Sequence, residues 1–190
     1  MPRHIDPEVE GRILEAARKL WRKGGEKSLS MRAVAKMART NTPAVYRRFR
    51  NREELLRALV ESYQQEVSRQ LRTCRSLQEM AKKYAEYALK YPQEHQLMMS
   101  GLLARTTKLR PNFEFALSRT AEWLGGNAGE HRSLMLAIVA LIDGFVLLRN
   151  TGWVREADSP ALNAGFARAL DVLVQNESQF RTSERGPTDD

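Results

Sequence analysis

The sequence is poor in the residues that hold disulfide-bonded domains and metal centres together. It contains a single cysteine, Cys74, among 190 residues, so no disulfide can form within the chain and no thiolate cluster can bind a metal. His95 and His131 have no second histidine, cysteine or carboxylate at a spacing typical of metal ligands. We therefore expect no metal and no cofactor, and a protein that works in a reducing compartment.

Long apolar runs are also missing. The N-terminal residues MPRHIDPEVEGR contain no apolar core like that of a signal peptide. The longest apolar stretch, residues 134–148, is too short to span a bilayer and contains Asp143. We expect a cytoplasmic protein without a membrane partner.

Recognisable catalytic motifs are absent as well. The sequence shows no paired catalytic carboxylates, no Ser-His-Asp or Cys-His set at a suggestive spacing, and no phosphate-binding loop. A missing linear motif does not exclude a site assembled in space, so a helical enzyme stays open as an alternative. The expectation is that the protein is not an enzyme.

Acidic residues are scarce in the first part of the chain only. Residues 1–75 contain 18 Lys and Arg against 9 Asp and Glu, whereas residues 76–190 contain 13 against 14. The two parts therefore carry +9 and −1, which sum to the net charge of +8. Such an asymmetry indicates a polyanionic partner for the N-terminal part. The alternative is an ordinary solvated helical face.

Nearly every segment has the periodicity of an α-helix, and none alternates convincingly with the period of a strand. The sequence therefore predicts an all-α protein. We expect an N-terminal three-helix head over residues 1–52 and a helical body over residues 53–176. The last residues, 177–190, are polar and are expected to be disordered.

Residues 30–56, SMRAVAKMARTNTPAVYRRFRNREELL, carry the most specific pattern. Ser30 is a good N-cap for a first short helix, and Asn41 or Thr42 for a second. The residues between them, Arg39 and Thr40, interrupt the apolar periodicity and predict a tight turn. Two short helices joined in this way form a helix-turn-helix, whose second helix enters the major groove of double-stranded DNA.

The outward face of this segment supplies candidate DNA contacts. Side chains that are short or cationic at the start of the second helix suit base edges; these are Thr40, Asn41, Thr42, Ala44 and Arg47. Polar side chains around them suit phosphates, which set register and much of the affinity; these are Ser30, Arg32, Tyr46 and Arg52.

Over about residues 8–60 the sequence resembles the DNA-binding domain of TetR-type (TetR/AcrR) bacterial transcriptional regulators. The specific part of the resemblance is the run YRRFRNREELL at residues 46–56. The sequence departs from the family at Arg39, where glycine is usual, and a left-handed arginine there costs roughly 1 kcal/mol. It also has Ala33 where the family often has an acidic residue that completes a capping box with Ser30.

The resemblance implies a body that binds a small molecule and thereby changes the spacing of two heads. The region between residues 87 and 123 is rich in methionine and aromatic residues, which suit an adaptable apolar pocket, although ordinary core is the alternative. The predicted pocket residues are Tyr87, Met98, Met99, Leu102, Phe113, Trp123 and Ile142.

Two C-terminal segments predict a subunit interface. The segment 128–150 is apolar nearly all round, which indicates burial on several sides, and residues 160–175 show one apolar stripe. In TetR-like proteins the last two helices form the dimer, whereas interior core is the alternative. The predicted interface residues are Leu134, Ile138, Phe145, Leu162, Phe166 and Leu170.

Together these patterns predict a homodimeric repressor that a small apolar or amphipathic ligand releases from a palindromic operator. The alternative that keeps the same head is a DNA-organising or protein-regulated factor without a small-molecule switch. In both cases double-stranded DNA is the expected partner.

Overall fold

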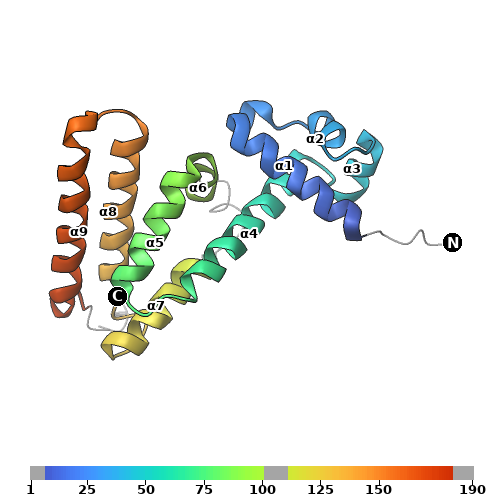
Figure 1. Ribbon diagram of the computed structural model, residues 1–190. Helices are drawn as coiled ribbons and strands as arrows, with labels where there is room; N and C mark the ends of the chain where they lie inside the picture. Colours follow the sequence, from blue (N-terminus) through green and yellow to red (C-terminus); the bar gives the residue numbers. More distant parts are fainter. Residues whose placement is uncertain (1–6, 101–110, 182–190) are drawn as a thin grey trace, which may run out of the picture. The chain divides into compact units, whose positions relative to one another are not determined.

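The computed structural model describes residues 7–100 and 111–181 of the chain. Among these residues there are only helices and connecting segments (Figure 1), so the all-α prediction is confirmed. The α-helices are α1 (Pro7–Ser28), α2 (Met31–Met37), α3 (Thr42–Arg48), α4 (Arg52–Leu71), α5 (Leu77–Lys90), α6 (Pro92–Met99), α7 (Pro111–Leu124), α8 (Arg132–Asn150) and α9 (Ser159–Gln175). Two short 3-10 helices are η1 (Glu156–Asp158) and η2 (Glu177–Phe180).

The chain divides into two compact units. The first contains α1, α2, α3, α4 up to Glu66, and α6; the second contains the end of α4, α5, α7, α8 and α9. The sequence places the boundary after residue 52. The structure differs in two ways, since most of α4 belongs to the first unit and α6 returns to it from further along the chain.

The first unit is built around one apolar cluster. Helix α1 contributes Ile13, Ala17 and Trp21 at helical spacing, all of them buried. Helix α1 breaks at two glycines, since Gly24 and Gly25 have non-helical backbone angles. Small residues let the short helices α2 and α3 pack closely beneath it, and the buried residues there include Val34, Ala35, Ala38 and Val45.

Side-chain caps fix where α2, α3 and α4 begin. Ser30 Oγ accepts a hydrogen bond from the Ala33 amide at 3.1 Å, and Asn41 Oδ1 accepts one from the Ala44 amide at 2.8 Å. Asn51 Oδ1 does the same for the Glu54 amide, also at 2.8 Å. Each bond satisfies an amide that has no partner within its own helix. The predicted N-caps Ser30 and Asn41 are therefore confirmed.

The second unit is a helical body in which α8 packs against α5 and α9. Helices α8 and α9 run side by side in opposite directions (Figure 1). Their facing sides interlock through the stacked rings of Phe145 and Phe166, with centroids 4.3 Å apart. Helix α8 has 19 residues and is longer than the apolar stretch 134–148 of the sequence. By length and composition alone, it is long and apolar enough to cross a membrane. Here its buried side faces other helices of the body.

The structure also corrects the start of the tail. Residues Glu177–Phe180 form η2 rather than a disordered segment. The reason is an ionic cluster: Arg181 donates to Glu177 Oε2 at 3.0 Å, to Glu130 Oε2 at 3.4 Å and to the Leu124 carbonyl at 3.0 Å. The rest of the tail lies outside the described residues.

Candidate nucleic-acid interface

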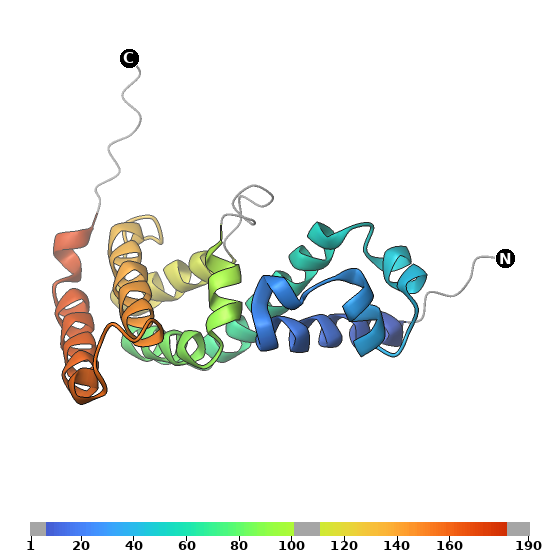
Figure 2. The same ribbon diagram turned by 90° about the horizontal axis from the view of Figure 1, so that it is seen from above.

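Helices α2 and α3 and the turn between them form the candidate interface. They follow α1 in a compact group (Figure 2). Helix α3 is short, and Asn41 and Arg47 are exposed on it together with Tyr46, whose side chain is 50% exposed. Thr40 and Thr42 are half-buried. The N-terminal end of α3 thus presents polar and cationic side chains to the outside, as a helix that reads a DNA groove must.

The turn before α3 contains an arginine in a left-handed conformation. Arg39 has a φ of 54° and is the one non-glycine residue with positive φ among those described. The Thr40 amide donates to the Ala35 carbonyl at 3.0 Å, and the Arg39 amide to the Lys36 carbonyl at 3.2 Å. These two bonds are the ones a helix makes when glycine ends it. The turn therefore keeps its usual shape, at a cost of roughly 1 kcal/mol for a side chain in that conformation.

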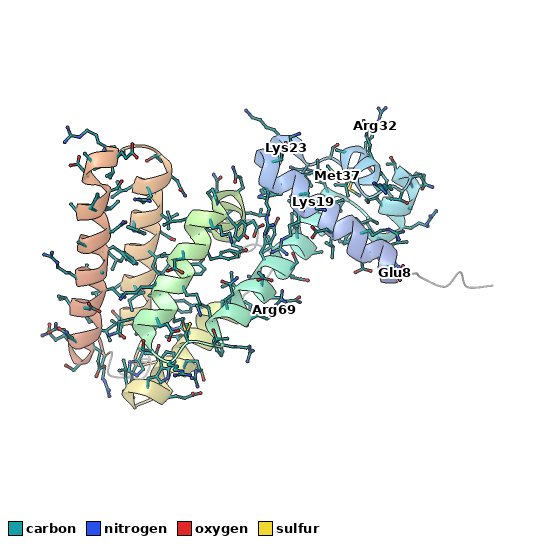
Figure 3. The ribbon with its side chains drawn as sticks, in the orientation of Figure 1. Glu8, Lys19, Lys23, Arg32, Met37 and Arg69 are labelled. Atoms are coloured by element: carbon teal, nitrogen blue, oxygen red, sulfur yellow. The ribbon has the colours of Figure 1, made fainter. Side chains whose placement is uncertain are left out.

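Positive charge surrounds this surface and is not neutralised by the part of the chain that the structure describes. The side chains of Arg32, Lys36, Arg47 and Arg50 are exposed and make no hydrogen bond or ion pair with the described residues. Arg32 projects outward from α2 (Figure 3). Exposed, unpaired cations around the start of a helix favour an anionic partner such as a phosphate backbone.

Two of the predicted DNA contacts are less available than the others. Ala44 is buried where α3 packs inward, so it does not present a surface to bases. Arg52 uses its guanidinium within the protein, donating to the Leu29 carbonyl at 3.2 Å and to the Glu26 side chain and carbonyl, each at 3.2 Å. Arg52 therefore fastens the start of α4 to the segment before α2.

Helix α6 is attached to α1 by a cluster that the sequence did not reveal. The Glu94 side chain is 0% exposed and accepts a hydrogen bond from Arg22 Nε. Arg18 Nε lies 3.5 Å from the same carboxylate oxygen. Trp21 Nε1 donates to the Gln93 carbonyl at 2.8 Å, and the Arg22 guanidinium lies 4.1 Å from the centre of the Tyr91 ring. The i,i+4 arginine pair on α1 was the available signal, but nothing local connects it to residue 94.

This cluster is electrostatically consistent. Burial acts to lower the pKa of Arg22, but the hydrogen bond to Glu94 raises that pKa above its ordinary value. Burial, and then the Glu94 charge, raise the pKa of the neighbouring Tyr63 hydroxyl. Arg18 also lies over the Tyr63 ring at 5.1 Å. The buried carboxylate is thus held by two guanidinium groups, which is the arrangement that makes a buried charge tolerable.

The structure does not bring the predicted pocket residues together in one unit. Met98 packs against the core of the first unit, and Met99 on the same helix is exposed. Tyr87 and Ile142 are buried in the second unit, where Phe113 and Trp123 are half-buried beneath Arg132 and Arg119. Leu102 lies outside the described residues.

The interior of the body instead contains a polar pair. Burial raises the pKa of the Tyr84 hydroxyl on α5, and the charge of Asp143 on α8 acts in the same direction. No group of three or more His, Cys, Asp or Glu side chains in the described part of the chain could hold a metal ion.

Most of the predicted interface residues lie inside the single chain. Five of them are buried within the single chain: Leu134, Ile138, Phe145, Phe166 and Leu170. Leu162 is half-buried. The apolar periodicity of these residues therefore corresponds to burial in the body's own core, the alternative that the sequence left open. A different face of α8 is exposed, and it carries Leu136, Ala140, Gly144 and Leu147.

The fold and this surface define a helix-turn-helix DNA-binding protein with a helical body. Residues 13–59 match the family model described as bacterial regulatory proteins, tetR family. No curated protein matches the sequence.

Solved structures share the fold along nearly the whole chain. The chain is similar to TetR-Q116A from Acinetobacter baumannii AYE in complex with minocycline, at 25% identity and a TM-score of 0.68, covering 92% of this chain and 98% of that one. It is also similar to a possible TetR family transcriptional regulator from Streptomyces coelicolor A3(2), at 19% identity and a TM-score of 0.63, covering 90% and 99%. The multidrug binding protein EbrR, complexed with imidazole, gives 21% identity and a TM-score of 0.59, covering 98% and 96%.

Residues 13–59 therefore match the tetR family of bacterial regulatory proteins, and the chain as a whole shares the fold of solved TetR structures.

Proposed function

We propose that the protein is a homodimeric, cytoplasmic repressor that binds a palindromic operator and is released from it by a small apolar or amphipathic molecule. The observation that carries this proposal is the head, in which a capped recognition helix is surrounded by exposed cationic side chains that have no partner among the described residues. No catalytic role is proposed.

Within the head we assign base reading first to Asn41 and Arg47, which are exposed on α3. The Oδ1 atom of Asn41 caps α3, which leaves its amide nitrogen to donate to a base or a phosphate. Thr40 and Thr42 are half-buried and are proposed as secondary contacts. Arg32, Tyr46 and the Ser30 helix start are proposed as phosphate contacts, which position the head without reading sequence.

The exposed face of α8 is the proposed dimer interface. Apolar side chains are exposed along it, with Leu147 at 61%. Gly144 lies on the same face, and a Cβ built there would meet nothing within 4 Å; the same holds for Gly165, which is exposed on α9. Glycine inside a helix costs up to about 1 kcal/mol relative to alanine. Close approach by the helices of a second subunit would explain both glycines.

Dimerisation matters for operator reading. A single seven-residue recognition helix offers few contacts, whereas two of them about 34 Å apart read successive half-sites of a palindrome. This geometric requirement supports the homodimer independently of the exposed α8 face.

Release by a small molecule is proposed because two similar proteins were solved with one, minocycline in TetR-Q116A and imidazole in EbrR. Tyr84 and Asp143 add half-buried polar groups to the largely apolar body, which suits an amphipathic ligand. The ligand would favour the form whose heads are wrongly spaced, and operator affinity would fall by its difference in binding free energy between the two forms.

The test is to select bound duplexes from a random DNA pool with the purified protein and to sequence them. An enriched palindromic sequence with half-sites about one helical turn apart supports the proposal and supplies the operator. Salt-sensitive binding without any enriched motif would contradict it and would favour a DNA-organising protein.

A further inference from the structure

The sequence keeps an arginine in a position where glycine would be easier to accommodate. Arg39 closes α2 with the hydrogen-bond pattern of a glycine-ended helix and has a φ of 54°. In that conformation the Cβ of an ordinary residue is crowded, whereas glycine is not. Strained conformations of non-glycine residues cluster at binding sites and switch regions.

No interaction among residues 7–100 and 111–181 explains why arginine is retained. The Arg39 side chain is exposed and forms no hydrogen bond or ion pair with the described residues. The contrast with the head's structural arginines is clear, because Arg52 bonds to Glu26 and Leu29, and Arg48 lies 3.4 Å from Glu10. Arg39 therefore has a strained backbone conformation and a guanidinium group that binds none of the described residues.

The location of Arg39 points to the partner. It lies two residues before Asn41, the N-cap of α3, so its Cα is within about 7 Å of the start of the recognition helix, since a residue spans at most about 3.5 Å. A recognition helix enters a major groove about 12 Å wide that is bordered by the two phosphate backbones. A long cationic side chain beside the helix start is thus placed at the groove edge.

We propose that Arg39 is a phosphate-binding residue of the head and that this contact is why the left-handed arginine is retained. This inference rests on the proposed DNA-binding function. The guanidinium can donate two parallel hydrogen bonds to one phosphate. The contact adds affinity and fixes the start of α3 against the backbone without reading sequence, and a dimer makes it twice.

The test compares Arg39→Gly, Arg39→Lys and the control Lys23→Ala. Lys23 is an exposed cation near the end of α1, away from α3 (Figure 3). Affinity for the duplex selected by the wild-type protein is measured between low and moderate salt, together with thermal unfolding. We expect Arg39→Gly to raise the unfolding midpoint by a few degrees, on the order of the shift for one relieved strained residue.

The same variant should bind the duplex roughly tenfold more weakly at low salt. The slope of log affinity against log salt should become less steep by about two per dimer, since each lost phosphate contact removes about 0.9. Arg39→Lys should keep most of the slope, and Lys23→Ala should keep all of it. More stable protein with weaker, less salt-dependent binding is a combination that a purely structural role would not produce.

Arg39→Gly with the wild-type salt slope would overturn the inference, whatever its stability. Failure of the DNA-binding proposal is a separate result, because it is seen with the wild-type protein alone as the absence of any selected duplex.

Discussion

At the scale of single residues, the cationic side chains of the head are of two kinds. Some bind other parts of the fold, and others have no partner among the described residues. Arg52 and Arg48 are engaged with acidic or carbonyl partners, whereas Arg47 and Arg32 have no such partner in the described ranges of the chain. Charge counts cannot make this distinction, because both kinds contribute equally to the net charge. Only the three-dimensional partners identify which arginines are available to DNA.

Arg47 and Tyr46 should differ in what they contribute to DNA binding. Arg47→Ala should relax sequence preference at one position of each half-site by about 1–3 kcal/mol, the usual contribution of a bidentate arginine–guanine contact. Tyr46→Phe removes only a hydroxyl group and should lower the binding affinity for all duplexes by a similar factor. Competition binding with single-base operator variants measures both effects. If the two variants change specificity equally, the assigned roles are wrong.

The thiol of Cys74 should react slowly in the folded protein. Its side chain is buried, and burial raises the pKa of the thiol, although Lys83 acts in the opposite direction. Because the thiolate is the reactive form, a disulfide-exchange reagent at neutral pH should label the native protein far more slowly than the unfolded protein. Equal labelling rates would show that Cys74 is accessible and would reopen a redox role.

At the scale of elements, local signals in the sequence predicted more than distant ones. The N-caps Ser30 and Asn41 depend on a few neighbouring residues, and the structure confirms them. Which face of α8 meets solvent depends on partners far along the chain. That is why Leu134 and Ile138 were expected at an interface and are found in the core.

The attachment of α6 to α1 should be a large contributor to the stability of the first unit. Glu94→Ala leaves two arginines without their shared partner and should lower the free energy of unfolding by about 2–4 kcal/mol, as for other broken buried pairs. Glu94→Gln keeps an acceptor and should lower it by less. Urea unfolding followed by circular dichroism measures both changes.

The matched control for Glu94 is Glu15→Gln. Glu15 forms an exposed i,i+4 pair with Lys19 at 3.6 Å, and such pairs contribute only about 0.5 kcal/mol or less. A Glu94→Ala variant as stable as this control would show that the buried carboxylate is not needed to hold α6.

At the scale of the whole molecule, the exposed face of α8 should decide oligomeric state and operator binding together. Leu147→Asp changes a side chain that is exposed in the single chain, so the subunit should still fold. In a dimer the same change buries an unpaired charge, which is strongly unfavourable. We expect a monomer by analytical ultracentrifugation and at least a hundredfold weaker operator binding.

The control for that interface is Lys82→Asp on α5, which places the same side chain at another exposed position of the body. It should leave both the oligomeric state and operator binding unchanged. A Leu147→Asp protein that remains dimeric would move the interface elsewhere.

The return of α6 to the first unit has a practical consequence for building chimeric regulators. The head is not encoded by one continuous stretch, because Gln93 and Glu94 complete it from beyond α5. A fragment ending within α4 would leave Arg18, Arg22 and Trp21 with their partners missing. Transplanting this head onto another body therefore requires two separate segments of the gene, and the second must be joined in register with a foreign α5.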